Sequence, residues 1–216
     1  MTQLSKFFRL LCLCISAVAS NASAVSSHVP VVENVLRNQF PTQPVALANT
    51  TEDLLQEYKH TGNVTSLIFY AYGMLKQADY FKTVNDIINA SEYAKTGFFY
   101  LDEAVDLNEK DPRVRYLRAR VDAYLPANLG RCVITVSDAD ILLSENNKFS
   151  ARLISNINAM NYRSLINCGE TNLASQFLQK IKASDEGAEI DITSGNTPPW
   201  DIDEVTNIIV PLVKGE

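Results

Sequence analysis

The sequence predicts an all-α protein built from successive antiparallel helix pairs. Strand signals are almost absent, because no Asn-Gly or Asp-Gly turn separates alternating apolar runs. Apolar residues recur instead at spacings of three and four, which is the period of an amphipathic helix. Start and stop signals, such as Asp111-Pro112 and Gly169, separate these runs. A simple irregular helical bundle is the alternative way to pack the same helices.

The first 24 residues have the organisation of a cleaved secretory signal. Lys6 and Arg9 precede or flank the start of an apolar run at Leu10–Ala19, and Ala22-Ser23-Ala24 provides the small residues that a signal peptidase requires. A run of about ten residues is much shorter than the roughly 20 that span a bilayer, so a retained anchor is the weaker interpretation. Cleavage after Ala19 is the alternative. We therefore expect a periplasmic or secreted protein.

Without this signal the chain is strongly acidic. Removing two cations from 19 leaves 17 basic side chains against 25 acidic ones, a net charge of about −8. This balance argues against nucleic acid as a partner, and no later apolar run is long enough to span a membrane. We divide the rest into an N-terminal extension at 25–48, a helical domain at 49–184 and an acidic C-terminal segment at 185–216.

Two apolar stripes define helices in the first half of the chain. The first stripe comprises Val64, Leu67, Ile68, Ala71 and Leu75. The second comprises Val84, Ile87, Ile88, Ser91, Ala94, Phe98, Leu101 and Val105. Ahead of them, Thr50 and Asp53 form a capping pattern that predicts a helix from about Glu52 to Gly62. Because no strong breaker lies within 82–105, that stretch is either one long helix or a hairpin.

Clear signals delimit the helices of the second half. Asp111-Pro112 is the strongest start, with an acceptor at the cap and proline at the first helical position. Residues 125–130 break that helix, and the next should run from about Arg131 to Glu145. The last two predicted helices cover Phe149–Asn167 and Thr171–Ala183.

Small and large apolar residues recur in these helices in a repeated order. The first copy is Gly97, Leu101, Ala104 and Leu107, the second is Gly169, Ala174, Leu178 and Ile181, and Ala139 with Leu143 makes a partial third. Between residues 64 and 184 this pattern resembles the tetratricopeptide repeat (TPR), with Phe81, Val84 and Ile88 in the large positions of a first helix. Asp79-Tyr80 offers a competing register in which the preceding helix comes first. The resemblance implies a short solenoid of helix pairs whose concave surface binds another protein.

Two cysteines remain after the signal, Cys132 and Cys168. An even count in an oxidising compartment favours a disulfide over a metal site or a redox pair, and two free thiols are the alternative. Such a bridge would join the start of one predicted helix to the end of the following one. The loop that it closes makes it worth roughly 3 to 4.5 kcal/mol.

Positive charge concentrates in one stretch of this acidic chain. The arginines are Arg113, Arg115, Arg118, Arg120 and Arg131. Guanidinium groups suit bidentate binding of an anion, which is one interpretation. The structural interpretation, which we favour, pairs them with Asp102, Glu103, Asp106, Glu109 and the acidic C-terminal segment. Asp122, four residues beyond Arg118, offers a further partner on the same helix.

The C-terminal segment combines acids with apolar residues. Seven acids and no base lie between 185 and 204, together with the single tryptophan, Trp200. A disordered acidic linker is one interpretation. Because Trp200 and the apolar residues of 205–213 are costly to leave in water, we expect the segment to dock on the helical domain. Calcium binding by these acids is a weak alternative, since no EF-hand loop is present.

Aromatic residues are dense in the middle of the chain, where they either fill a core or line a groove. The candidate binding residues are Arg115, Arg118, Arg131, Tyr72, Tyr93 and Tyr100. We expect a scaffold that binds another exported or envelope protein. The alternative is a periplasmic protein that binds a small anionic or amphipathic ligand in an aromatic and arginine-lined pocket. Because nucleophile, histidine-pair and phosphate-loop motifs are missing, we expect no enzymatic activity, no cofactor and no metal.

Overall fold

The computed structural model describes residues 28–183 and 197–216, and the predicted signal at 1–24 lies outside them. Within this part of the chain no strand is present, which confirms the all-α prediction. The helices are α1 (Pro30–Asn38), α2 (Pro44–Thr61), α3 (Val64–Thr83), α4 (Ile87–Asp106), α5 (Pro112–Asp122), α6 (Cys132–Ser144), α7 (Ala151–Asn167), α8 (Thr171–Ala183) and α9 (Val210–Lys214). Short turns lie at η1 (Ala127–Leu129) and η2 (Asn146–Lys148), and a π-helical turn, η3 (Glu204–Ile209), leads into α9.

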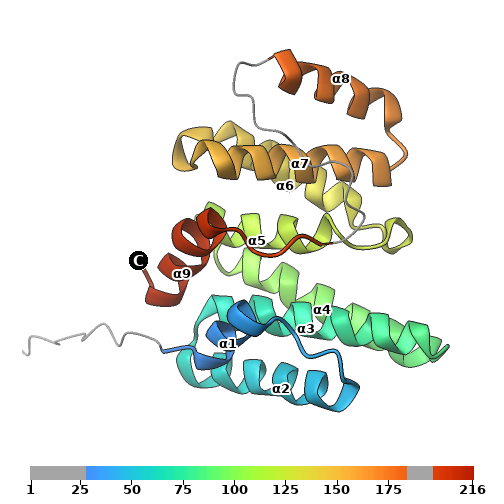
Figure 1. The fold of residues 1–216 in the computed structure, drawn as a ribbon, viewed down its shortest axis with the longest axis vertical. Coiled ribbons are helices and arrows are strands. Elements are labelled where there is room, and N and C mark those ends of the chain that lie inside the picture. The colour runs from blue at the N-terminus through green and yellow to red at the C-terminus, as the bar shows by residue number, and fades with distance from the viewer. Residues whose placement is uncertain (1–27, 184–196) are drawn as a thin grey trace, which may run out of the picture.

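Consecutive helices pack side by side, so the chain forms a stack from α2 at one end to α8 at the other (Figure 1). Short connections join α2 to α3, α3 to α4 and α7 to α8, and these neighbours run antiparallel. Helix α1 packs on α2 and α3, and α9 packs on α3. The predicted antiparallel helix pairs are therefore present, whereas a TPR-like register stays a prediction.

The first predicted stripe lies in the centre of the core. Leu67, Ile68, Ala71 and Leu75 are all buried there. Helices α3 and α4 approach closely because Gly97 has no side chain, since a Cβ at this position would lie 2.8 Å from Leu75 Cγ and 3.0 Å from the Ala71 carbonyl oxygen. The small residue at 97 thus sets the spacing of this helix pair.

The strongest start and stop signals of the sequence are confirmed. The Asp111 side chain accepts a hydrogen bond from the backbone N–H of Arg113 at 3.0 Å and caps α5. Gly62 ends α2 with φ 66°, and Gly130 follows η1 with φ 72°, both in the left-handed region that favours glycine. Local capping chemistry therefore decides these boundaries.

The predicted start of the helix that ends at Gly62 is wrong. Helix α2 begins at Pro44, not near Glu52, and the segment assigned to an N-terminal extension includes α1 and the first turn of α2. Glu57, which is buried, accepts hydrogen bonds from the backbone N–H of Val31 at 2.8 Å and from the Ser66 hydroxyl at 2.8 Å. The first turn of α1 has no side-chain cap of its own, so its free backbone N–H groups donate to a residue of α2 instead.

Most of the stretch at 82–105 is one long helix, α4, and a turn at 84–86 separates this helix from the end of α3. Asn85 adopts φ 60°, and the Asp86 side chain caps α4 by accepting from the backbone N–H of Asn89 at 3.1 Å. The register that placed Phe81, Val84 and Ile88 in one first helix is therefore wrong, because the turn separates them. Helix α3 precedes α4 and packs on it. The competing register, in which the preceding helix comes first, stays a prediction.

Residues 197–216 return to the stack and lie along α5 and α3 (Figure 1). The Trp200 ring stacks on Phe69 with the ring centroids 5.6 Å apart. Ile208, Ile209 and Leu212 are buried in the same core as α3 and α5. The Asn63 side chain, which also caps α3, donates hydrogen bonds to the carbonyls of residues 212 and 213 at 3.2 and 3.0 Å. The acids at 185–191 lie outside the described residues.

None of the described helices is long and apolar enough to cross a membrane.

Candidate functional site

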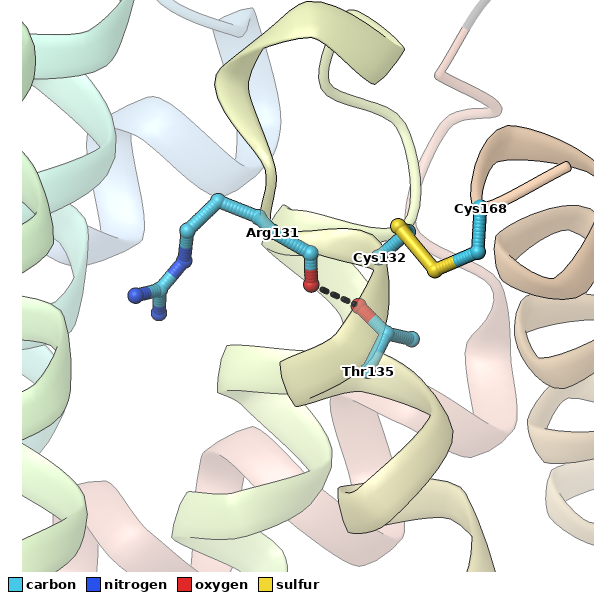
Figure 2. The surroundings of a disulfide bond; sticks show 4 residues. All are labelled: Arg131, Cys132, Thr135 and Cys168. Atoms are coloured by element: carbon cyan, nitrogen blue, oxygen red, sulfur yellow. Dashed lines mark hydrogen bonds between the residues drawn. A yellow bond between two sulfur atoms is a disulfide. The ribbon is translucent and has the colours of Figure 1, made fainter.

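Cys132 and Cys168 form a disulfide, as predicted (Figure 2). Their Cα atoms lie 5.6 Å apart. Cys132 is the first residue of α6 and Cys168 is the residue that caps α7, so the bridge fastens one end of this helix pair. The loop between the two residues makes the bridge worth about 4 kcal/mol in the chain-entropy model.

Arg131 precedes the bridge and points away from it. Its carbonyl accepts a hydrogen bond from the Thr135 hydroxyl at 3.5 Å, while its guanidinium extends away from the sulfurs (Figure 2). The guanidinium donates to the two oxygens of Asp102 at 2.6 and 2.9 Å, and to Asp122 Oδ2 at 2.9 Å from Nε. Arg131 therefore connects α4, α5 and the start of α6.

Two further arginines, both on α5, complete a cluster of alternating charges. Arg115 donates to Asp138 Oδ1 at 2.7 Å, and Arg118 donates to both oxygens of Asp138 at 2.8 Å. Arg118 also reaches Asp102 Oδ1 at 3.2 Å. We call this set the arginine–aspartate cluster, and its members are Arg115, Arg118, Arg131, Asp102, Asp122 and Asp138. Its three cations and three carboxylates form ion pairs that link α4, α5 and α6.

The cluster agrees with the structural interpretation of the arginines, but their carboxylate partners differ in part from the predicted ones. The side chains of Arg115, Arg118 and Arg131 are only 17%, 11% and 10% exposed. Of the acids expected from α4 and the following turn, Asp102 takes part in the cluster, and the other carboxylates come from Asp122 and Asp138. An incoming anion would have to displace one of these aspartates.

Asp122 is the most perturbed acid of the cluster. Its side chain is buried at the end of α5, and burial raises its pKa to about 7, although the hydrogen bond and charge of Arg131 act in the opposite direction. Its Oδ1 atom has no hydrogen-bond partner among the described residues, whereas Oδ2 is paired with Arg131. The cluster thus contains one carboxyl that can change charge near neutral pH.

A second buried ion pair ties the C-terminal segment to α5. Arg120 Nε donates to Glu204 Oε1 at 2.8 Å, and the Tyr116 hydroxyl donates to the same oxygen at 2.9 Å. The Arg120 guanidinium also contacts the faces of Trp200 and Tyr124, each centroid 4.9 Å from Cζ. Burial is the main cause that raises the pKa of Tyr116, and the Glu204 charge adds to it. The described part of the C-terminal segment therefore meets the arginine stretch through a buried ion pair.

A groove of about 560 Å³ runs between α3 and α4 and is walled by the end of α5 and the turn that follows. Short side chains, those of Ala78, Ala90 and Ala94, line it. Aromatic rings from three elements, Tyr72, Phe98 and Tyr124, lie along it. Three lysines, Lys76, Lys82 and Lys95, and one acid, Asp79, complete its charged lining. We call this site the α3–α4 groove.

The predicted binding residues do not lie together in this groove. Tyr72 lines it. Tyr93 instead packs on Phe81 at 4.9 Å between centroids, and Tyr100 packs on Tyr70 at 5.1 Å. The groove lysines were missed, because a lysine at helical spacing is the usual residue of a solvated helix face and carries no signal of its own.

An exposed apolar patch lies at the α3–α4 turn. Val84, Ile87 and Ile88 are 52%, 62% and 79% exposed, although the sequence predicted them to be buried in a stripe. The stripe begins only at Ala94, since the turn at 84–86 rotates the first residues of α4 out of the core. We call these three residues the hairpin tip.

No group of three histidines, cysteines or carboxylates in the described ranges is arranged to hold a metal ion. Comparison of the chain with models of protein families, with curated proteins and with solved structures finds no match.

Proposed function

We propose that the protein is an exported, TPR-like interaction scaffold that binds another exported or envelope protein through the hairpin tip. The observation that carries this proposal is the exposure of three large aliphatic side chains in a span of five residues. Apolar side chains that gather on the surface of a soluble protein mark interaction sites more often than single exposed ones do.

Export is the second part of the proposal. It is supported by the signal-like start of the sequence and by the disulfide, because such bridges persist in oxidising compartments. The intact mass of the protein recovered from its own cells tests this part. A chain that starts at or near residue 25 is expected, and a chain that retains residues 1–24 would contradict it.

The arginines do not favour the alternative of an anion pocket at Arg115 and Arg118. Both guanidiniums already bind the Asp138 carboxylate at 2.7 to 2.8 Å, and Asp138 is only 1% exposed. A ligand there would have to replace a buried carboxylate that is already well placed.

Quantitative affinity capture tests the hairpin tip. The Val84→Ser/Ile88→Ser variant should lose a partner that the wild type captures, by about tenfold or more, because each buried aliphatic side chain contributes roughly 1.5 to 3 kcal/mol to an interface. Val45→Ser/Ile202→Ser is the matched control, since both residues are 73% exposed and lie elsewhere. If tip variant and control capture the same proteins in the same amounts, the tip is not the binding surface.

A further inference from the structure

The α3–α4 groove has a shape that suits a narrow apolar ligand. Alanines at 78, 90 and 94 leave a furrow between helices that Gly97 holds close together. The volume of about 560 Å³ lies within the range of roughly 300 to 1,000 Å³ that is typical of small-molecule sites. A ten-residue helix, about 15 Å long and 10 Å wide, fills on the order of 1,200 Å³ and does not fit. A single alkyl chain is narrow enough to fit in the groove.

The charges of the groove are opposite to those of the chain as a whole. Lys76, Lys82 and Lys95 face one acid, Asp79, in a protein whose net charge is −6. Lys76 and Lys82 have no carboxylate within ion-pair distance among the described residues, and Lys76 Nζ lies 5.1 Å from the Tyr72 ring centroid. Lys95 pairs with Glu92 at 2.9 Å, but both side chains are more than 60% exposed and remain solvated.

We propose that the α3–α4 groove binds a single-chain amphiphile with one anionic head group. The alkyl chain lies on the alanines, along the rings of Tyr72 and Phe98. The head group lies at the rim, where the lysine stems cover apolar surface and their ammonium groups stay in water. Unlike the arginines of the cluster, Lys76 and Lys82 are free of carboxylate partners in the described structure, so an anion does not have to displace one. This site adjoins the hairpin tip, because Ile87 of the tip also lines the groove. The tip variant Val84→Ser/Ile88→Ser leaves Ile87 unchanged, so each proposal can fail without the other.

Isothermal titration calorimetry with dodecanoate below its micelle concentration tests the head-group charge. Dodecanoate should bind once per chain, and dodecyltrimethylammonium should bind at least about tenfold more weakly, because two lysines favour an anion and repel a cation. Lys76→Glu and Lys82→Glu should each weaken dodecanoate binding about fivefold or more. Lys82→Arg, which keeps the charge, and Lys180→Glu, an exposed residue of α8, should bind as the wild type does.

A filled groove tests the location of the alkyl chain. Ala90→Phe places a ring in the furrow and should reduce dodecanoate affinity at least about tenfold, whereas Ala46→Phe, at an exposed position of α2, should leave it unchanged. The helical circular dichroism of both variants establishes that they are folded. The proposal is overturned if the cationic amphiphile binds equally well, if Ala90→Phe still binds dodecanoate, or if dodecanoate does not bind.

Discussion

Asp122 and Arg131 form a buried ion pair in which Arg131 Nη2 lies 2.7 Å from Asp122 Oδ2. Asp122 is the last residue of α5, and Arg131 immediately precedes α6, so the pair closes the connection between these helices. The same arginine reaches across to Asp102 of α4 and lies next to the disulfide that fastens α6 to α7. One residue therefore links the middle of the stack to its covalently fastened end.

The Asp122 carboxyl should make stability depend on pH. Its folded pKa, raised to about 7, lies above the ordinary aspartate pKa of 3.8, so between these values the folded state holds a proton that the unfolded state has lost. This contribution is fully present below the unfolded pKa and is lost as pH rises through the folded pKa. In Asp122→Asn the loss is absent, so relative to wild type the variant should gain roughly 2 to 3 kcal/mol of unfolding free energy from pH 5 to pH 8.

Urea unfolding at both pH values measures this difference. Asp140→Asn, an exposed aspartate of α6, is the control and should follow the wild type at each pH. Parallel pH profiles for Asp122→Asn and wild type would show that Asp122 is ionised throughout this range.

The Arg120–Glu204 pair should be required for docking of the C-terminal segment. Glu204→Leu leaves the Arg120 guanidinium buried without its carboxylate, which should cost about 3 to 5 kcal/mol, whereas Arg120→Met/Glu204→Leu should recover most of that loss. Urea unfolding gives both values, and limited proteolysis should cut near Trp200 in the single variant first. Asn207→Ala, exposed on η3, is the control. Equal stabilities of the single and double variants would contradict the role of the pair.

The disulfide should stabilise the α6–α7 pair without being needed for the rest of the fold. Cys132→Ala/Cys168→Ala should lose about 4 kcal/mol, which lowers Tm by roughly 10 °C for a chain of this size, as scanning calorimetry would show. Dithiothreitol should lower the Tm of the wild type by a similar amount and leave the double variant unchanged. A wild-type Tm that does not respond to dithiothreitol would argue that the bridge contributes little.

Gly97→Ala should destabilise the protein even though alanine is the better helix former. A Cβ at this position would lie 2.8 Å from Leu75 Cγ and 3.0 Å from the Ala71 carbonyl oxygen, so α3 and α4 would have to separate. The cost should be about 1 to 3 kcal/mol, larger than the gain in helix propensity of roughly 1 kcal/mol. Gln179→Ala at an exposed position of α8 should change the unfolding free energy by less than about 0.5 kcal/mol. If urea unfolding shows that Gly97→Ala is more stable than the wild type, α3 and α4 can separate at little cost.

The sequence by itself determined the features that depend on neighbouring residues. Helical periodicity predicted the stripe at Leu67 and Leu75, and capping chemistry predicted the start at Asp111 and the end at Gly62, because a cap bonds backbone groups only two to four residues away. The pairing of Cys132 with Cys168 followed from their number and from the inferred compartment.

Only the tertiary structure decided which distant groups meet. The turn at Asn85 has no strong sequence signal, so the apolar hairpin tip was mistaken for part of a buried stripe. Asp138 and Asp122 pair with arginines because the α4, α5 and α6 contacts bring them together, and spacing along one helix cannot report this. The role of the groove lysines also depends on the tertiary structure. A lysine belongs to a binding site only where residues of other elements form an apolar surface beside it.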